Sequence, residues 1–150
     1  MSDTLLHDLV ARDAIRRLLA LYCDAVSRRD PDAISSLFTQ DAVVTIADGA
    51  DRIGPAEIVE GLRRAVSVFS YLHQKCDTGF IDIDGERASA RVNILEVNRL
   101  GDSDSVTMIC GVYEDDFRVD DGAWRFCRRR FTLQFRTVLA AREIEDFLAR

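Results

Sequence analysis

The chain is poor in residues that interrupt regular structure, with 8 Gly and 2 Pro among 150 residues. This argues against long disordered or low-complexity segments. No long hydrophobic run is present either, because every stretch of about 18 residues contains charges, which excludes a transmembrane helix. Residues 1–8 are acidic and lack the basic start of a signal peptide, so we expect a cytoplasmic protein.

Metal-ligating and nucleotide-binding patterns are also missing. The 4 cysteines include no C-x-x-C pair, and the 2 histidines, His7 and His73, lie far apart. No zinc-ligand spacing results, so we expect no metal and, without a secretion signal, reduced thiols. There is no G-x-G-x-x-G, P-loop lysine or G-x-S-x-G, so we expect no cofactor. A reactive thiol at Cys76, beside Lys75, is a weak alternative.

Acidic residues outnumber basic ones, which gives a net charge of −6 and a pI of about 4.9. This balance argues against nucleic acid or an anionic membrane as a partner. The local exception is Arg128–Arg130, between Phe126 and Phe131. It is either a strip for stacking nucleotides or a strand with one arginine paired to a carboxylate, and the overall charge favours the strand.

The first third has the apolar spacing of amphipathic helices. The first helical stripe comprises Leu6, Val10, Ile15, Leu18, Leu19, Tyr22, Ala25 and Val26. Asp30 and Pro31 then predict the N-cap and first residue of a short helix, which reaches Phe38 and is broken by residues 39–41. A strand over 42–46 and a turn over 48–51 follow, and Gly54-Pro55 begins a third helix.

From about residue 71 the apolar period becomes two, which indicates strands. We expect a strand over 71–76, a hairpin around 84–86, and a second hairpin of long strands around 120–122. Residues 140–150 suggest a short C-terminal helix. Helices followed by a meander of long strands predict a single α+β domain over 1–150. Helices packed on a strongly curved, mostly antiparallel sheet would leave a cone-like pocket.

Four segments of this pattern resemble a known family. The segments are 15–43, with Arg29-Asp30-Pro31-Asp32 and Leu37-Phe38-Thr39-Gln40-Asp41; Gly54–Ile58; His73 followed by Ile83–Ala88; and Gly111–Asp115 followed by Asp121–Phe126 and Arg129. Over about residues 8–136 the chain resembles SnoaL-like proteins of the nuclear transport factor 2-like (cystatin-like) superfamily. The resemblance implies a pocket for a small hydrophobic or aromatic molecule, and a homo-oligomer, either a dimer or a trimer.

The resemblance also implies candidate catalytic residues. His73 corresponds to a catalytic histidine of scytalone dehydratase and would face the pocket as a general acid–base. Tyr22 and Tyr113 would line the pocket and bond a substrate oxygen, or pack in the core. Asp115 and Arg129 predict a cross-strand ion pair.

The chain departs from the dehydratase pattern on its first helix. Ser27 stands where those enzymes have an acidic residue, Val26 replaces a tyrosine, and their second histidine falls near Val97. The alternatives for the missing carboxylate are Asp24, Asp41, Glu96 and Ser27. We expect Asn93, Leu95 and Val97 to share one strand face, with Asn93 either pointing into the pocket as a hydrogen-bond donor or lying at an edge or in solvent. Glu96 would be on the opposite face unless a bulge re-aims it. The expected substrate-binding residues are Asn93, Ser27, Val26, Phe38, Phe69, Leu95 and Val97.

These features predict a cofactor-independent lyase (dehydratase-like) or isomerase/cyclase. It would act by general acid–base catalysis on a small cyclic or aromatic hydroxy or keto compound. One alternative is a non-catalytic protein that binds small molecules in the same pocket. Another is a structural small subunit like that of ring-hydroxylating dioxygenases.

Overall fold

A computed structural model describes residues 3–46 and 49–140. The elements in chain order are α1 (Asp3–Ser27), η1 (Pro31–Leu37), β1 (Phe38–Thr45), β2 (Asp51–Ile53), α2 (Gly54–Val66), β3 (Phe69–Cys76), β4 (Phe80–Asp84), β5 (Arg87–Leu100), β6 (Ser105–Asp120) and β7 (Ala123–Ala140). The predicted C-terminal helix and part of the predicted turn over 48–51 lie outside the described residues. No described helix is long and apolar enough to cross a membrane.

The predicted helix boundaries are confirmed, with one correction. Asp30 caps η1, which is a 3₁₀ helix, by accepting a hydrogen bond from the Ala33 N–H at 3.3 Å. Residues 39–41 do not form a loop: β1 begins at Phe38, directly after the helix. Phe38 is therefore the first residue of a strand rather than the last residue of a helix. Its side chain is buried in the core and only 1% exposed.

The sheet has seven strands in the order β2-β1-β7-β6-β5-β3, with β4 pairing β5 beside β3. All pairings are antiparallel except the parallel β1–β7 pair. The α+β class and the mostly antiparallel sheet are thereby confirmed. The β6–β7 hairpin turns at Asp121 and Gly122, both with positive φ (49° and 75°), as a two-residue hairpin turn requires.

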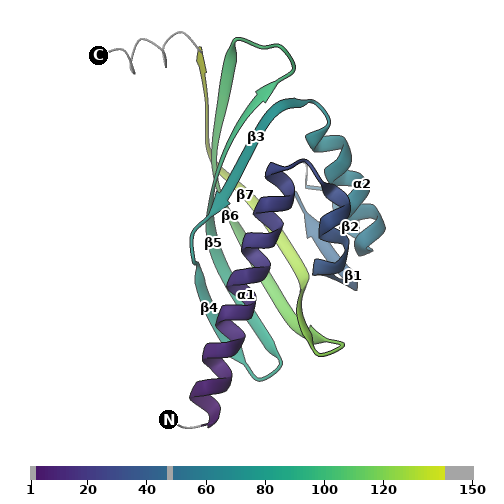
Figure 1. The fold of residues 1–150 in the computed structure, drawn as a ribbon, viewed down its shortest axis with the longest axis vertical. Coiled ribbons are helices and arrows are strands. Elements are labelled where there is room, and N and C mark those ends of the chain that lie inside the picture. Colours follow the sequence, from purple (N-terminus) through teal and green to yellow (C-terminus); the bar gives the residue numbers. More distant parts are fainter. Residues whose placement is uncertain (1–2, 47–48, 141–150) are drawn as a thin grey trace, which may run out of the picture.

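The long strands bend, as their length requires. β6 and β7 have 16 and 18 residues, and their register shifts between Cys110 and Gly111 and between Asp116 and Phe117. Such irregularities increase local twist and curl a sheet. α1 lies across one face of this sheet, and η1, β2 and α2 lie together at one side (Figure 1).

Aromatic rings fill the core between α1 and the sheet. Phe126 stacks on Phe38 with ring centroids 5.1 Å apart, and Phe117 lies 4.9 Å from Phe126. Tyr22 of α1 meets both Phe38 and Phe126 edge-on at 6.1 Å. These contacts place α1 on the sheet and bury one edge of Tyr22.

Arg118 and Asp41 join β6 to β1 on the surface and should affect stability in acid. Arg118 donates two hydrogen bonds to Asp41, at 2.6 and 3.0 Å. These bonds are the main reason that the pKa of Asp41 falls from 3.8 to about 2. A lowered carboxylate pKa stabilises the fold above the unfolded pKa, and that contribution is lost as pH falls through the folded pKa.

We therefore expect Arg118→Gln to lose stability relative to wild type at pH 5, and the two proteins to converge between about pH 4 and pH 2. The difference should be small because the pair is exposed to solvent. Melting temperatures measured across this range test it. A difference in melting temperature that stays constant down to pH 2 would show that protonation of Asp41 is not its cause.

Candidate functional site

A cavity of about 260 Å³ lies between α1, α2 and the curled sheet. Its walls are mostly aliphatic and aromatic, as expected for a small-molecule site. The lining residues are Tyr22, Val26, Val44, Ile46, Arg52, Ile58, Gly61, Leu62, Ala65, Val66, Phe69, Leu72, Gln74, Ile94, Glu96, Ile109, Tyr113 and Phe131. Few of the lining side chains are polar: Tyr22, Arg52, Gln74, Glu96 and Tyr113.

Glu96 provides the one carboxylate among the described lining residues. One oxygen accepts a hydrogen bond from Gln74 Nε2 at 2.9 Å, and the other accepts one from Asn98 Nδ2 at 2.8 Å. A carboxylate has about four acceptor positions. Two amides therefore orient the group and leave acceptor capacity for a ligand.

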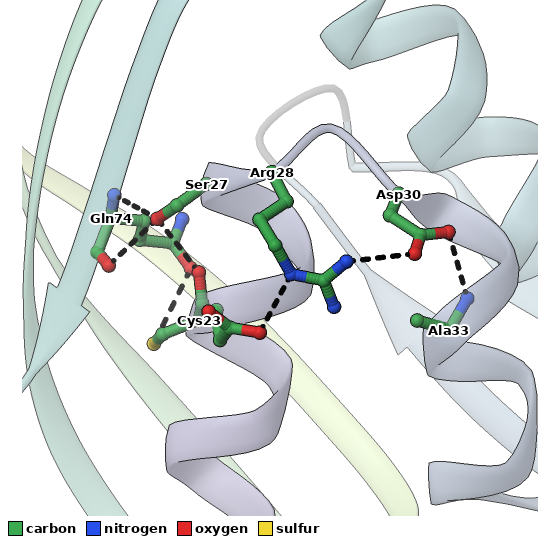
Figure 2. A network of polar contacts seen from close by, with 7 residues as sticks. Cys23, Ser27, Arg28, Asp30, Ala33 and Gln74 are labelled. Carbon is green, nitrogen blue, oxygen red and sulfur yellow. Dashed lines mark hydrogen bonds and ion pairs between the residues drawn. The ribbon is translucent and has the colours of Figure 1, made fainter.

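Gln74 is itself held in place by α1. The Ser27 hydroxyl accepts a hydrogen bond from the Gln74 backbone N–H at 2.8 Å. It donates to the backbone carbonyl of Cys23 at 2.8 Å and, at 3.2 Å, to that of Gln74. The Cys23 thiol donates to Gln74 Oε1 at 3.7 Å. Figure 2 shows this cluster where α1 meets β3. Ser27 thus positions Gln74, which in turn orients Glu96.

Tyr22 and Tyr113 both line the cavity and are buried, as the sequence predicted. Their rings meet edge-on with centroids 6.0 Å apart. The Tyr113 hydroxyl donates to Gln74 Oε1 at 3.5 Å. Burial raises the pKa of Tyr22 above 10, and burial together with the neighbouring Tyr22 raises that of Tyr113 well above it. Both phenols therefore keep their protons near neutral pH. Tyr113 has one O–H donor, so donation to a ligand would replace its long bond to Gln74.

The predicted ion pair between Asp115 and Arg129 is present and buried. Arg129 Nε and Nη2 donate to the two carboxylate oxygens at 2.7 and 2.6 Å. The guanidinium carbon lies 3.9 Å from the Tyr113 ring centroid and 4.2 Å from those of Tyr22 and Phe126. Burial raises the pKa of Asp115, and Arg129 opposes that rise. Burial alone would lower the pKa of Arg129. The charge of Asp115 and its hydrogen bonds outweigh that effect, so the pKa of Arg129 is raised.

One buried guanidinium nitrogen, Arg129 Nη1, has no hydrogen-bond partner among the described residues. An unsatisfied buried donor is costly, and two of the three rings around this guanidinium line the cavity. The guanidinium of this ion pair thus lies directly behind Tyr22 and Tyr113.

His73 does not face the cavity, so this expectation from the resemblance is wrong. Along β3 the buried positions are Leu72 and Gln74, whereas His73 and Lys75 are exposed. Successive side chains of a strand point to opposite faces, so a shift of one residue reverses the assignment. The inward position that the resemblance gave to His73 belongs to Gln74.

The predicted face of β5 is wrong for the same reason. Asn93 and Leu95 are exposed, and Val97 pairs with His73 on that outer face. Asn93 Nδ2 instead donates to Asp77 at 2.7 Å. Glu96, which we expected on the far side, is the residue that reaches the cavity.

The remaining predicted lining residues divide in two groups. Val26 and Phe69 line the cavity, as expected. Phe38 lies behind Tyr22 in the aromatic core, and Ser27 bonds the β3 backbone, so neither forms the wall. Gln74 and Arg52 also line the cavity and were not expected there, whereas Glu96 was expected only as one alternative for the missing carboxylate.

The structure also shows where the four alternatives for the missing carboxylate lie. Asp24 is exposed and pairs with Arg28, and Asp41 is exposed and pairs with Arg118. The Ser27 hydroxyl bonds backbone groups of Cys23 and Gln74. Only Glu96 of the four lines the cavity.

Cys23 is the cysteine that contributes to the site, through its bond to Gln74. All four cysteines are free. The pKa of Cys76 is lowered, mainly by a hydrogen bond with the Cys23 thiol rather than by Lys75. Among residues 3–46 and 49–140, no group of three His, Cys, Asp or Glu side chains is arranged to hold a metal ion.

The arginines at 128–130 divide between the two faces of β7. Arg129 points into the core, whereas Arg128 and Arg130 lie in an open hollow with Asp82, Arg91, Glu114 and Asp116 among its walls. Acidic and basic residues alternate across the neighbouring strands there, with Glu114 opposite Arg130 and Asp116 opposite Arg128. The strand interpretation is thus confirmed for Arg129.

Comparisons with known proteins agree with this architecture. A family model for the SnoaL-like domain matches residues 7–130. An uncharacterised protein of Mycobacterium tuberculosis (strain ATCC 25618 / H37Rv) is 30% identical over 129 residues, which cover 83% of this chain and 86% of that protein. The chain therefore belongs to the SnoaL-like domain family.

Solved structures show the same fold at lower identity. A putative scytalone dehydratase from Novosphingobium aromaticivorans DSM 12444 has a TM-score of 0.80 and 24% identity, covering 87% of this chain and 88% of that one. The hexachlorocyclohexane dehydrochlorinase LinA-type3 of Novosphingobium barchaimii LL02 has a TM-score of 0.82 and 20% identity, covering 90% and 94%. The nuclear transport factor 2-like fold is thereby confirmed.

Proposed function

We propose that the cavity carries out a cofactor-independent lyase or isomerase reaction with Glu96 as general base. The substrate would be a small cyclic or aromatic hydroxy or keto compound. The observation that carries this proposal is a single oriented carboxylate in a mostly apolar cavity, faced by two protonated phenols. Solved relatives of the same fold that are named as a dehydratase and a dehydrochlorinase support the reaction class.

Each group has one task in this scheme. Glu96 removes a proton from carbon next to a carbonyl, and Tyr22 and Tyr113 donate hydrogen bonds to the oxygen on which negative charge develops. Arg129, held against both rings, favours that charge. The proton on Glu96 then returns to another carbon in an isomerisation, or passes to a departing hydroxyl that leaves as water.

Solvent deuterium exchange tests the scheme without knowledge of the product. We expect wild type in D₂O to exchange the carbon-bound protons next to the carbonyl of a ring ketone from a panel, followed by NMR. Tyr113→Phe should exchange about 10²-fold more slowly, because it removes one donor to the developing oxyanion. Tyr71→Phe is the matched control, since Tyr71 is exposed on β3. Equal rates for Tyr113→Phe and wild type would contradict the phenol's role.

The second candidate is non-catalytic binding of the same ligand class. It is favoured by the network in which Cys23, Tyr113 and Asn98 all bond to Gln74 or Glu96, because these bonds hold the polar groups of the cavity in place. A ligand that raises the melting temperature of wild type yet shows no deuterium exchange would support binding alone.

A further inference from the structure

The Gln74 side chain lies between the proposed base and one of the two phenols. Its Nε2 donates to a carboxylate oxygen of Glu96 at 2.9 Å. Its Oε1 accepts from the Tyr113 hydroxyl at 3.5 Å and from the Cys23 thiol at 3.7 Å. Gln74 is only 5% exposed, so these contacts are made inside the protein. One amide therefore bonds both to the base and to a group that would bind the substrate oxygen.

The direction of this amide follows from the charge on Glu96. An ionised carboxylate has only acceptor positions, so Gln74 must present its NH₂ group to Glu96 and its oxygen to the other side. The hydroxyl of Tyr113 and the thiol of Cys23 both donate to that oxygen. The single O–H of Tyr113 is thereby directed at Gln74 rather than at a ligand.

Protonation of Glu96 removes the reason for this arrangement. A protonated carboxyl has an O–H that requires an acceptor, and an amide NH₂ group cannot accept. The last torsion of a glutamine side chain is soft and roughly two-fold, so the amide can turn over in place. Its oxygen would then accept from Glu96, and its NH₂ group would face Tyr113 and Cys23. The phenolic oxygen and the sulfur can both accept, so the turned amide keeps partners on each side.

Asn98, the second amide on Glu96, has no such alternative. Its Nδ2 donates to the other carboxylate oxygen at 2.8 Å, and among residues 3–46 and 49–140 its side chain bonds to Glu96 alone. Turning this amide would leave its NH₂ group without a partner among those residues. The carbonyl oxygen of a protonated Glu96 can still accept from Asn98. Gln74 is thus the amide that responds to the proton.

We propose that Gln74 turns over when Glu96 takes the substrate proton, and that this movement releases the Tyr113 hydroxyl to the substrate oxygen. The substrate C–H bond breaks, its proton forms an O–H bond with Glu96, and the remaining electron pair moves negative charge onto the carbonyl oxygen. Tyr113 then accepts from Gln74 and donates to that oxygen. The donor is supplied only as the charge develops, which favours the transition state over the bound substrate. Gln74 is a positioning residue, and this inference rests on the proposed function.

Ring ketones test the inference because affinity and rate should respond differently. Cyclohexanone and 2-tetralone are titrated by calorimetry, and deuterium exchange is followed on the same proteins. In wild type, Tyr113→Phe should change ketone affinity by less than about twofold, because the hydroxyl is bonded to Gln74. It should still slow exchange by about 10²-fold. In the Gln74→Leu background the hydroxyl is free before the reaction, so Tyr113→Phe should weaken ketone binding by about fivefold.

A second variant and a control accompany this cycle. Gln74→Met has an unbranched side chain of similar length without an amide, and the cycle is repeated on it, so failure of Gln74→Leu to fold does not decide the outcome. Lys75→Gln is the matched control, because Lys75 is the next residue of β3 and is exposed on its other face. In that background Tyr113→Phe should act as it does in wild type.

NMR of wild type follows the amide directly as the pH is lowered. We expect nuclear Overhauser effects from the Gln74 NH₂ protons to move from Glu96 to the Tyr113 ring at the pH where the Glu96 carboxyl carbon titrates. The other ionisable side chains on the surrounding elements are Tyr22 and Cys23 of α1, Arg52 of β2, Cys76 of β3, Tyr113 and Asp115 of β6, and Arg129 of β7. A change at Gln74 that follows one of these groups would not coincide with the Glu96 signal.

The inference is overturned if Tyr113→Phe changes ketone affinity equally in wild type and in the Gln74 variants. It is also overturned if the contacts of the Gln74 amide do not change with protonation of Glu96. If exchange still depends on Glu96 and Tyr113 in either case, the proposed function stands without the movement of Gln74. If wild type binds no ketone and exchanges no proton, the cavity is not the substrate site, and both proposals are wrong.

Discussion

Replacing Glu96 with glutamine should lower turnover by about 10²- to 10⁴-fold, the usual contribution of a general base. Glutamine keeps the size and one acceptor oxygen but cannot take the proton. One of the two amides that now donate to Glu96, from Gln74 and Asn98, would meet an N–H group instead. We expect that loss to cost about 1 kcal/mol of unfolding free energy. The variant should therefore fold and yet be nearly inactive.

The measurement is the deuterium-exchange rate or turnover of Glu96→Gln against wild type, with melting temperatures recorded for both. Glu114→Gln is the matched control, because Glu114 lies on the outer face of β6 opposite Arg130. Retention of more than a tenth of the wild-type rate by Glu96→Gln would exclude Glu96 as the base. Unchanged ligand affinity with no turnover in either protein would instead support the binding role.

The largest stability effect should come from Asp115→Ala. Both partners of the Asp115–Arg129 pair are buried, with side chains 0% and 1% exposed. The substitution would leave the Arg129 charge without its carboxylate, among three aromatic rings. Breaking such a pair from one side costs about 3–5 kcal/mol. Urea unfolding of Asp115→Ala and wild type measures the difference.

The double variant Asp115→Leu/Arg129→Met separates the cost of an unpaired charge from the value of the pair. Replacing both charged side chains of a buried pair with apolar side chains of similar size often leaves the stability of the fold unchanged or increases it. We therefore expect it to recover most of the stability that Asp115→Ala loses. Asp41→Ala, which breaks the exposed pair with Arg118, serves as the control and should have a small effect. A loss below about 1 kcal/mol for Asp115→Ala would show that the buried pair contributes little.

The pattern on β5 contained the information needed to orient it. Ala88, Ala90, Val92 and Ile94 form one alternating set that continues to Glu96 and Asn98, and all but Glu96 are buried. The other set includes Arg91 and Arg99, whose charges belong on the solvent face. The resemblance places Leu95 and Val97 on the pocket face, whereas these arginines indicate the opposite orientation of the strand.

The same signal is present on β3. Lys75 has the parity of His73 and marks the outer face. The scarcity of histidine and its usefulness in acid–base chemistry favoured an inward position for His73, but strand alternation decides the direction of a side chain irrespective of its chemistry. Buried Gln74 was not expected, because polar residues enter a core only with partners, and its partner Glu96 lies on another strand, β5.

Local chemistry in the sequence determined the elements and their class. The periods of 3.6 and 2, the cap at Asp30 and the turn at Asp121-Gly122 depend on neighbouring residues, so they could be predicted from sequence and are confirmed. The cross-strand pair Asp115–Arg129 was also predicted, but its exact register depends on the shift between Asp116 and Phe117.

Only the tertiary structure decided which side chains share the cavity. Arg52, Gln74 and Glu96 come from three strands, and they face one space because the sheet curls around α1 and α2. That curl depends on register shifts in β6 and β7 and on packing against the helices, which are long-range effects with no local sequence signature. A change of one residue in register would turn each of these groups away from the cavity, so their convergence is a property of the fold rather than of any segment.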